Sequence, residues 1–218
     1  MSKGCDSLPR MHRPRRILAH VLMVGALAAC SRKPAEDFSR IADPVARERK
    51  EKDESFRSGK GSPLPDQDRR RFRGLDYFPV SPTYRFRVKL NRYENPLELR
   101  ISTNTTEVRR GLRYGYFEFE LEGRACRLQV YKVFEDNGSG GASLFVPFRD
   151  ATSTRETYGG GRYIDLTENT TGIYDLDLNR AYNPFCAYGG EYSCPLPPAE
   201  NTLPVAVRAG EKTYHPPS

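Results

Sequence analysis

The sequence contains no tryptophan and little histidine, and the second shortage excludes several kinds of site. Of three histidines in 218 residues, only His215 lies beyond the first 29 residues. A metal site built from several histidines is therefore excluded, and a Ser-His-Asp triad would have to recruit this one residue. No P-loop, dinucleotide fingerprint or G-x-S-x-G motif occurs. The sequence predicts neither a metal nor a cofactor.

Long hydrophobic runs are also scarce, and the one exception is residues 17–29, which overlap a basic stretch at 10–20. A basic region followed by an apolar run too short to span a bilayer comfortably is typical of an export signal. Translation could begin at Met1 or at Met11, and the second start gives a leader of more usual length. We expect residues 1–29 to be a signal peptide.

The apolar run ends in Leu27-Ala28-Ala29-Cys30, which resembles the bacterial lipobox. The resemblance implies that the Cys30 thiol carries diacylglycerol, and two or three acyl chains such as palmitate anchor a protein stably in a membrane. An ordinary secretory peptide that ends in cysteine, or a short membrane anchor, is the alternative. The residue after the cysteine is Ser31 and not aspartate. In a Gram-negative cell this favours, by the same resemblance, the outer membrane over the inner one, with the domain facing the periplasm.

Strong positive charge is absent from the rest of the chain. The formal net charge is +7, but five basic residues and one acidic residue fall within residues 1–29. The remaining charge of about +3 is interleaved with acidic residues and forms no basic stripe with aromatic residues between. We therefore predict no binding to nucleic acid. The expected partners are the membrane, through the lipid anchor, and a small ligand or another component of the cell envelope.

The chain after the leader is long enough for one ordinary domain. We expect residues 30–42 to be the lipidated cysteine and a polar tether, and residues 43–218 to be a single domain. Its first segment, 43–57, predicts a short helix with Asp43 as N-cap and Pro44 at the first helical position. The many charges of this helix favour a solvated face rather than a binding site.

Beyond the helix, hydrophobic residues alternate with polar ones, as in half-buried strands. The pattern is clearest at Phe117, Phe119 and Leu121, which alternate with glutamates before a turn at Gly123-Arg124. Another turn is expected at Asn95-Pro96. Seven or eight short strands predict a mostly β domain, an antiparallel sandwich or barrel. We expect strands near residues 84–90, 97–101, 117–121, 126–130, 143–149, 161–166, 173–179 and 203–208.

Two polar segments stand apart as candidate sites, and the first is residues 144–166. If residues 163–166 are extended, Tyr163 and Asp165 lie on one face of the strand. Together with Asp175 and Asp177 of the next strand, Asp165 could form a pair of carboxylates that divide acid and base roles. The same residues could equally form the solvated face of an antiparallel sheet, with an arginine tying down a loop. The candidates from this segment and the next strand are Asp150, Tyr158, Arg162, Tyr163, Asp165 and Asn179.

The second segment, residues 179–201, is rich in proline, tyrosine and cysteine and predicts a rigid loop. Outside the cytoplasm, Cys186 and Cys194 would form a disulfide whose closed loop contributes about 2.5 kcal/mol. A free thiol pair is the alternative, and a zinc site would need two more ligands where only Cys126 and His215 remain. The candidate binding residues of this loop are Tyr182, Asn183 and Asn201.

Short motifs in and around these segments carry a resemblance to a known family. They are Ser62-Pro63-Leu64, Gly74-Leu75-x-Tyr77-Phe78, Leu144-Phe145-x-Pro147-Phe148-x-Asp150-x-Thr152, Thr157-Tyr158-x-x-Gly161-Arg162-Tyr163, Asn183-Pro184-x-Cys186-Ala187, Cys194-Pro195-Leu196-Pro197-Pro198-x-x-Asn201-x-Leu203-Pro204-Val205 and Ala209-Gly210-Glu211. From about residue 50 to 212 the chain resembles the uncharacterised bacterial and archaeal family called domain of unknown function 1684. The resemblance implies one β-rich domain and brings no activity, cofactor or catalytic residue. Members can lack an export signal, which keeps the free thiol pair open as an alternative.

Three functions follow as hypotheses. The first is a membrane-anchored envelope module that binds a ligand or partner through the face at 150–165 and the loop at 182–201. The second is a hydrolase that uses Asp150 or Asp165, with Arg162 and Tyr158 steadying an anion. The third is a thiol redox or metal function of the two cysteines in the loop.

Overall fold

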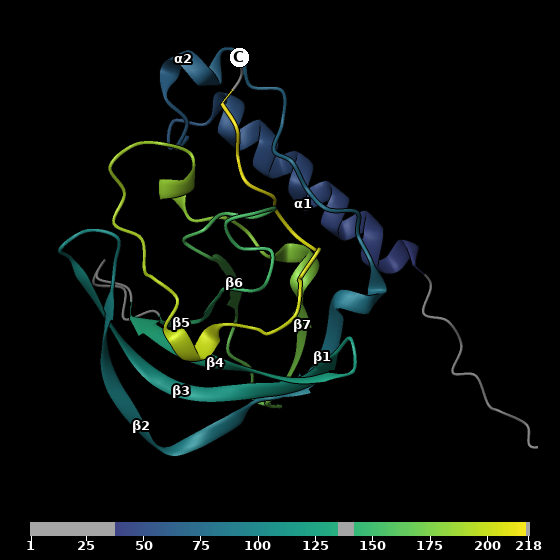
Figure 1. Ribbon diagram of the computed structural model, residues 1–218, viewed down its shortest axis with the longest axis vertical. Helices are drawn as coiled ribbons and strands as arrows, with labels where there is room; N and C mark the ends of the chain where they lie inside the picture. Colours follow the sequence, from purple (N-terminus) through teal and green to yellow (C-terminus); the bar gives the residue numbers. More distant parts are fainter. Residues whose placement is uncertain (1–37, 135–141, 217–218) are drawn as a thin grey trace, which may run out of the picture. The chain divides into compact units, whose positions relative to one another are not determined.

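The strands form two antiparallel sheets that share one core, in a sandwich-like arrangement (Figure 1). The computed structural model describes residues 38–134 and 142–216. The larger sheet has the strand order β2-β3-β4-β5-β6, and the smaller sheet pairs β1 with β7. The predicted mostly β fold is confirmed, and over the described residues it is a sandwich and not a closed barrel. The strands are β1 (Arg85–Lys89), β2 (Asn91–Ser102), β3 (Val108–Leu121), β4 (Arg124–Phe134), β5 (Ala142–Phe148), β6 (Arg162–Leu166) and β7 (Ile173–Asp177).

Aromatic rings join the two sheets across the core. Phe86 of β1 stacks at 4.6 Å between ring centroids on Phe119 of β3, and Tyr174 of β7 lies 5.6 Å from Phe117. Cys126 is buried in the same cluster, on the apolar side of its strand. These contacts explain why alternation in the sequence identifies the strands, since one face of each is removed from water.

The hairpin between β3 and β4 follows directly from its sequence. Leu121 pairs with Arg124, so the connection is the two residues Glu122 and Gly123, one position earlier than the predicted turn. Both have positive φ, 52° and 71°, as a tight turn matched to the twist of the strands requires. The hydrophobic alternation therefore continues in register from one strand into the next.

The predicted turn at Asn95-Pro96 is wrong, because both residues lie inside β2. The pairing of β2 with β3 shifts register between Arg92 and Leu97, which accommodates the irregularity as a bulge. Proline has no N–H to give to a neighbouring strand, but β2 is an edge strand of the larger sheet, where that loss is tolerated.

The predicted strand at 203–208 is also wrong, since this segment is irregular. Its backbone is paired, but mostly to side chains and loops. Leu203 donates to the Arg149 carbonyl at 2.8 Å, and the Val207 N–H donates to the Asp150 carboxylate at 3.1 Å. Alternation of apolar residues indicates that alternate side chains are buried. It does not indicate which groups form hydrogen bonds with the backbone N–H and C=O groups.

The N-terminal helix is longer than the sequence predicts. α1 (Ser39–Ser58) begins after Phe38, so Asp43 is not its N-cap and Pro44 lies within the helix. Ile41 is buried on the same helix, and its burial favours the extra turn despite the hydrogen bond that proline removes. A second, four-residue helix, α2 (Asp66–Arg69), follows.

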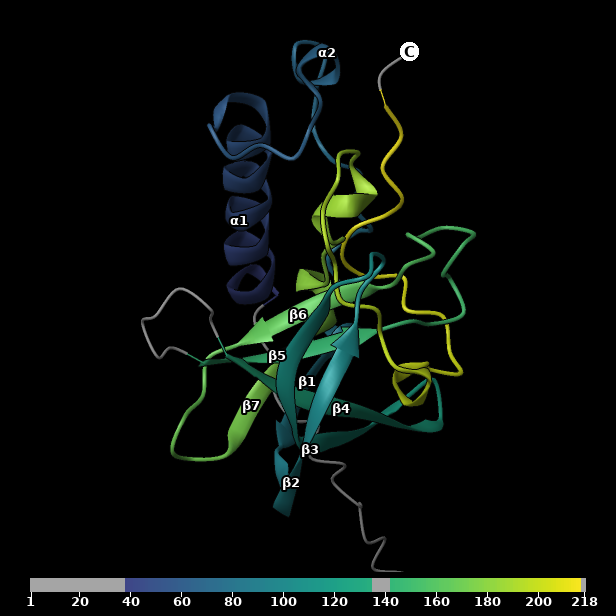
Figure 2. The ribbon, with the colours of Figure 1, turned by 90° about the vertical axis from the view of Figure 1, so that its left-hand side faces the viewer.

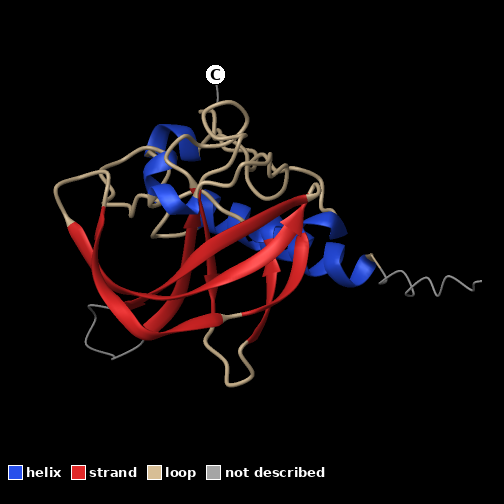
Figure 3. Cartoon of the chain, turned by 60° about the horizontal axis from the view of Figure 1, so that its bottom comes forward, coloured by secondary structure: helices blue, strands red, loops and turns tan. Residues whose placement is uncertain are grey.

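Helix α1 and most of the long connections gather at one side of the strands (Figure 3), and Figure 2 shows α1 beside the loops that follow β7. Short 3₁₀ turns at Leu178–Arg180 and Phe185–Ala187 belong to these loops. No helix among the described residues is long and apolar enough to cross a membrane. The fold thus places α1 against the polar segment at 179–188.

Candidate functional site

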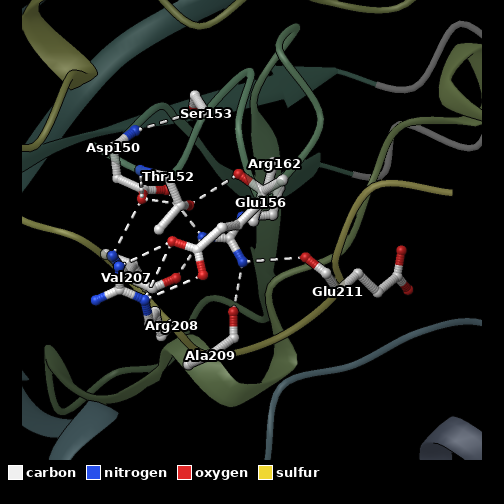
Figure 4. Close-up of polar contacts among 10 residues, drawn as sticks. Asp150, Thr152, Ser153, Glu156, Arg162, Val207, Arg208, Ala209 and Glu211 are labelled. Atoms are coloured by element: carbon white, nitrogen blue, oxygen red, sulfur yellow. Dashed lines mark hydrogen bonds and ion pairs between the residues drawn. The ribbon is translucent and has the colours of Figure 1, made fainter.

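Asp150 and Arg162, the centre of the first predicted site, form a buried ion pair. Their side chains are 1% exposed, and the Arg162 Nη2 lies 2.8 Å from the Asp150 Oδ2. Arg162 also donates to three backbone carbonyls, those of Val207 at 2.9 Å, Glu211 at 3.2 Å and Ala209 (Figure 4). Both terminal nitrogens of the guanidinium are therefore occupied by groups of the protein itself.

The Asp150 carboxylate is equally occupied. Its Oδ1 accepts hydrogen bonds from the Thr152 N–H at 2.8 Å, the Thr152 hydroxyl at 2.6 Å and the Val207 N–H at 3.1 Å. A carboxylate without solvent contact and with both oxygens engaged has no capacity left for a substrate. The pair binds the segment at 205–211 to β6 and to the loop after β5, which is a scaffold role.

The other candidates of the first segment do not converge with this pair. Asp165 is exposed and accepts a hydrogen bond from the Tyr182 hydroxyl. Tyr163 donates to the Pro195 carbonyl, and its ring packs on Phe145. The described residues therefore contain no pair of predicted carboxylates facing each other across a cleft.

The asparagines of the predicted list hold backbone in place. Asn201 is fully buried and bonds to the Gln129 N–H and carbonyl. Asn183 donates its side-chain N–H to the Lys212 carbonyl at 2.8 Å, and Asn179 exchanges hydrogen bonds with the backbone of Ser81. Such bonds explain why Asn179 and Asn201 are buried without requiring a ligand, whereas the Oδ1 of Asn183 is buried without a partner.

Cys186 and Cys194 lie side by side as free thiols. The Cys186 N–H points to the Cys194 Sγ at 3.3 Å, and the Tyr158 hydroxyl lies 3.6 Å from the Cys186 Sγ. Burial, the hydrogen bond with Cys194 and the electrostatic effect of the Cys194 thiol raise the pKa of the Cys186 thiol to about 11. Burial and the thiol raise the pKa of Tyr158 to about 12. Neither group is poised to ionise near neutral pH.

A different site lies where one face of α1 meets the segment after β7. We call it the α1 pocket, and its volume is about 180 Å³. The helical residues that line it follow helical spacing, so they share one face of α1. Of the predicted candidates, Asn179 and Tyr182 line it. The lining residues are Val45, Glu48, Arg49, Lys52, Tyr77, Asn179, Arg180, Ala181, Tyr182 and Glu211.

Two polar atoms of the α1 pocket are buried without a partner, the Arg49 Nε and the Tyr77 hydroxyl. The Arg49 guanidinium donates from Nη1 to the Phe78 carbonyl at 2.9 Å and from Nη2 to the Asn179 carbonyl at 3.1 Å. It also stacks on the Tyr77 ring, with Cζ 4.4 Å from the centroid. An unpartnered buried donor costs about 1–3 kcal/mol, so a pocket that retains two of them requires an explanation.

The charges around the pocket are unevenly matched. Lys52 pairs with the buried carboxylate of Glu211, which also accepts from the Tyr188 hydroxyl and from the Asn183 N–H at 2.9 Å. Arg49 has no carboxylate within ion-pair distance among the residues described. Burial lowers the pKa of Arg49, while Tyr77 and Glu211 raise it, but a guanidinium remains charged at neutral pH.

Reasoning from the sequence missed Arg49, Lys52, Tyr77 and Glu211. The charges of the helix predicted a solvated face, but Arg49 and Lys52 point to the α1 pocket. Two signals were available. Arg49 and Lys52 lie three residues apart on the face that carries Val45, and Glu211 is a single carboxylate at the end of an apolar segment.

A larger, more open depression of about 980 Å³ lies beside β2 and the loop before β7. Its central carboxylate, Glu168, already accepts hydrogen bonds from Tyr114 and Lys132 and pairs with Arg92 at 3.3 Å. Lys89 and Arg92 also line this depression, but none of its lining residues has a buried polar side-chain atom without a partner among the described residues, and volume alone does not mark it as a binding site.

The fold and the α1 pocket define a small antiparallel β domain with a polar cavity beside its N-terminal helix. The chain belongs to the family described as Protein of unknown function (DUF1684), which matches residues 70–212. The solution NMR structure of an uncharacterized protein from gene locus rrnAC0354 of Haloarcula marismortui is 37% identical, with a TM-score of 0.62. The match covers 82% of this chain and 97% of that one. No curated protein matches the chain. Tyr77, Tyr182 and Glu211 lie within the residues of the family match, whereas Arg49 and Lys52 precede them.

Proposed function

We propose that this chain is a lipid-anchored, non-catalytic module of the cell envelope that binds a small polar ligand in the α1 pocket. The observation that carries the proposal is the pair of buried, unpartnered polar atoms in one cavity, the Arg49 Nε and the Tyr77 hydroxyl. A bound ligand that accepts their hydrogen bonds removes the cost of leaving them unpaired. The hydrolase hypothesis lacks such support, because Asp150 and Arg162 are occupied by the protein.

The binding test compares two tyrosine variants of the full chain in non-ionic detergent. Tyr77→Phe removes only the hydroxyl in the pocket, and Tyr214→Phe removes another buried, unpartnered hydroxyl that does not line it. Thermal unfolding is measured with a library of small acids, amides, sugars and amines. A ligand at 100 times its Kd adds about 2.7 kcal/mol to the free energy of unfolding. We expect hits that stabilise the wild type and Tyr214→Phe but are weaker for Tyr77→Phe. A library without such hits contradicts the proposal.

The membrane anchor is supported by the sequence, and Cys30 lies outside the described residues. Small residues precede it and an apolar run leads to it, as a lipoprotein signal requires. Metabolic labelling with an alkyne fatty acid in a bacterial host should label the wild type and not Cys30→Ser. Cys5→Ser is the matched control, because Cys5 lies in the leader far from the end of the apolar run, and it should label normally. Label retained by Cys30→Ser contradicts the anchor.

We also propose a disulfide between Cys186 and Cys194 in the loop at 179–201. Its role is structural. The closeness of the thiols supports it, and the raised pKa of Cys186 disfavours a redox catalyst, which needs a thiolate. Intact mass after alkylation, with and without prior reduction, tests it on protein exported by the host. Two thiols that react only after reduction support the disulfide. Thiols that react without reduction contradict it.

A further inference from the structure

We infer that the ligand of the α1 pocket is a small monoanion of the carboxylate class. This inference rests on the proposed binding function and adds the chemistry of the ligand. It follows from three properties of the pocket: the kind of hydrogen bond it leaves unmet, the one charge it leaves unpaired and its size.

The unmet hydrogen-bonding capacity of the pocket is that of donors. The Arg49 Nε–H can only donate, and the unpartnered hydroxyl of Tyr77, on whose ring Arg49 stacks, is free to donate. Lys52 makes one hydrogen bond, to Glu211, and an ammonium has three donors. The buried carboxylate of the pocket is already engaged, since Glu211 takes hydrogen bonds on both oxygens. A ligand that fits these groups presents oxygen acceptors.

The charges of the pocket leave one cation without a counter-ion. Glu211 pairs with Lys52, and Arg180 pairs with Glu48 at 3.0 Å and with the buried Asp177 at 3.6 Å. Arg49 is the remaining cation, and in the described part of the chain its partners are two carbonyls and the Tyr77 ring. Glu211 and Asp177 act on Arg49 only from beyond ion-pair distance, so a ligand with one negative charge would supply the close partner that stabilises a partly buried cation.

The size and the walls of the pocket limit the ligand to a few carbons. A volume of about 180 Å³ corresponds to roughly six waters at about 30 Å³ each. Val45, Ala181 and the ring of Tyr182 supply apolar surface beside the donors. A short-chain carboxylate offers two oxygens for the Arg49 Nε and the Tyr77 hydroxyl, one negative charge, and a small apolar body for these walls.

The test uses acetate and its neutral analogue acetamide, which have nearly the same shape. Nitrogen-15 NMR of the full chain in non-ionic detergent follows the Arg49 Nε–H directly, and ionic strength is held constant with chloride. Inorganic phosphate is the third probe. We expect acetate to shift the Arg49 Nε–H and to bind about tenfold more tightly than acetamide, which is the ratio that one charge-assisted hydrogen bond provides. Tyr77→Phe should weaken acetate about tenfold, and Tyr214→Phe should leave it unchanged.

The outcomes separate the inference from the function on which it rests. If acetamide or phosphate binds at least as tightly as acetate, with the same sensitivity to Tyr77→Phe, the carboxylate inference is overturned while the binding function stands. If Tyr214→Phe weakens acetate as much as Tyr77→Phe does, the inference is overturned because the effect is not local. If none of the three probes, and no compound of the library, binds in a way that depends on Tyr77, both fail.

Discussion

Two arginines of this domain, the buried Arg162 and the partly buried Arg49, have opposite surroundings. Arg162 has a carboxylate partner and three backbone carbonyls, and its side chain is 1% exposed. Arg49 has two backbone carbonyls and an aromatic ring, and its Nε is buried without a partner. The first site is complete by itself, while the second is complete only with something added. A buried charge therefore marks a binding site only when its hydrogen bonds are left unfinished.

Residues 207–211 contribute both to the surroundings of Arg162 and to the α1 pocket. Residues 207–211 supply carbonyls to Arg162, and the Glu211 side chain, which points away from Arg162, pairs with Lys52 (Figure 4). Gly210 makes this possible with φ of 75°, and a Cβ there would lie 2.4 Å from the Ala181 carbonyl. The scaffold and the pocket are thus built on adjacent residues, and mutations distinguish them.

The largest effect should come from removing each arginine in turn. Arg162→Met leaves the Asp150 carboxylate buried and unpaired, and we expect it to lower the free energy of unfolding by about 3–5 kcal/mol. Arg49→Met loses two hydrogen bonds but also removes an uncompensated cation, so we expect a loss of no more than about 2 kcal/mol. Urea denaturation measures both.

Arg162→Lys is the graded control for that pair, because it keeps the charge and loses the planar fork that reaches several acceptors. It should fall between the wild type and Arg162→Met. Equal losses for Arg49→Met and Arg162→Met would contradict the distinction between a complete and an incomplete site.

A smaller effect of opposite sign is expected from Tyr77→Phe without ligand. Removing a buried hydroxyl that has no partner should raise the free energy of unfolding by about 1 kcal/mol, or the Tm by roughly 2–4 °C. Tyr214→Phe should do the same, since its hydroxyl is also unpartnered. Saturating acetate should cancel the advantage of Tyr77→Phe alone, and a lower Tm for Tyr77→Phe without ligand would contradict an unpartnered hydroxyl.

The smallest effect is expected at an arginine that is exposed. Arg208 forms a bidentate pair with Glu156 at 2.9 and 3.1 Å, with both side chains in contact with water. Glu156→Gln should leave the unfolding midpoint nearly unchanged at high salt, because solvent and ions screen such pairs. A loss comparable to that of Arg162→Met would show that pairing, and not burial, sets the scale.

The sequence predicts most of the fold, because burial of alternate residues leaves a record in it. Phe117, Phe119 and Leu121 indicate their strand and the hairpin that follows. The same record misleads at 203–208, where the Asp150 side chain and loop backbone take the place of a neighbouring strand. Apolar pattern predicts which side chains are buried, and it cannot predict the partners of the backbone.

The candidate site was much less predictable. Asp150 and Arg162 have the residue types of a catalytic pair, but the sequence does not show that three carbonyls of a distant segment surround the arginine. Conversely, Arg49 lies in a helix whose charges suggest solvent, and only the packing of α1 turns it inward. Residue type predicts capacity for chemistry, and the unmet part of that capacity depends on tertiary contacts.

The position of residues 207–211 in the chain has a consequence for folding. This segment is synthesised after every described strand, yet Arg162 of β6 and Lys52 of α1 both depend on it for partners. Without this segment Lys52 loses its carboxylate partner, whereas Arg162 keeps Asp150 but loses its three carbonyl acceptors. The same few residues therefore complete both the scaffold around Arg162 and one wall of the α1 pocket, so that a chain interrupted before this segment lacks both.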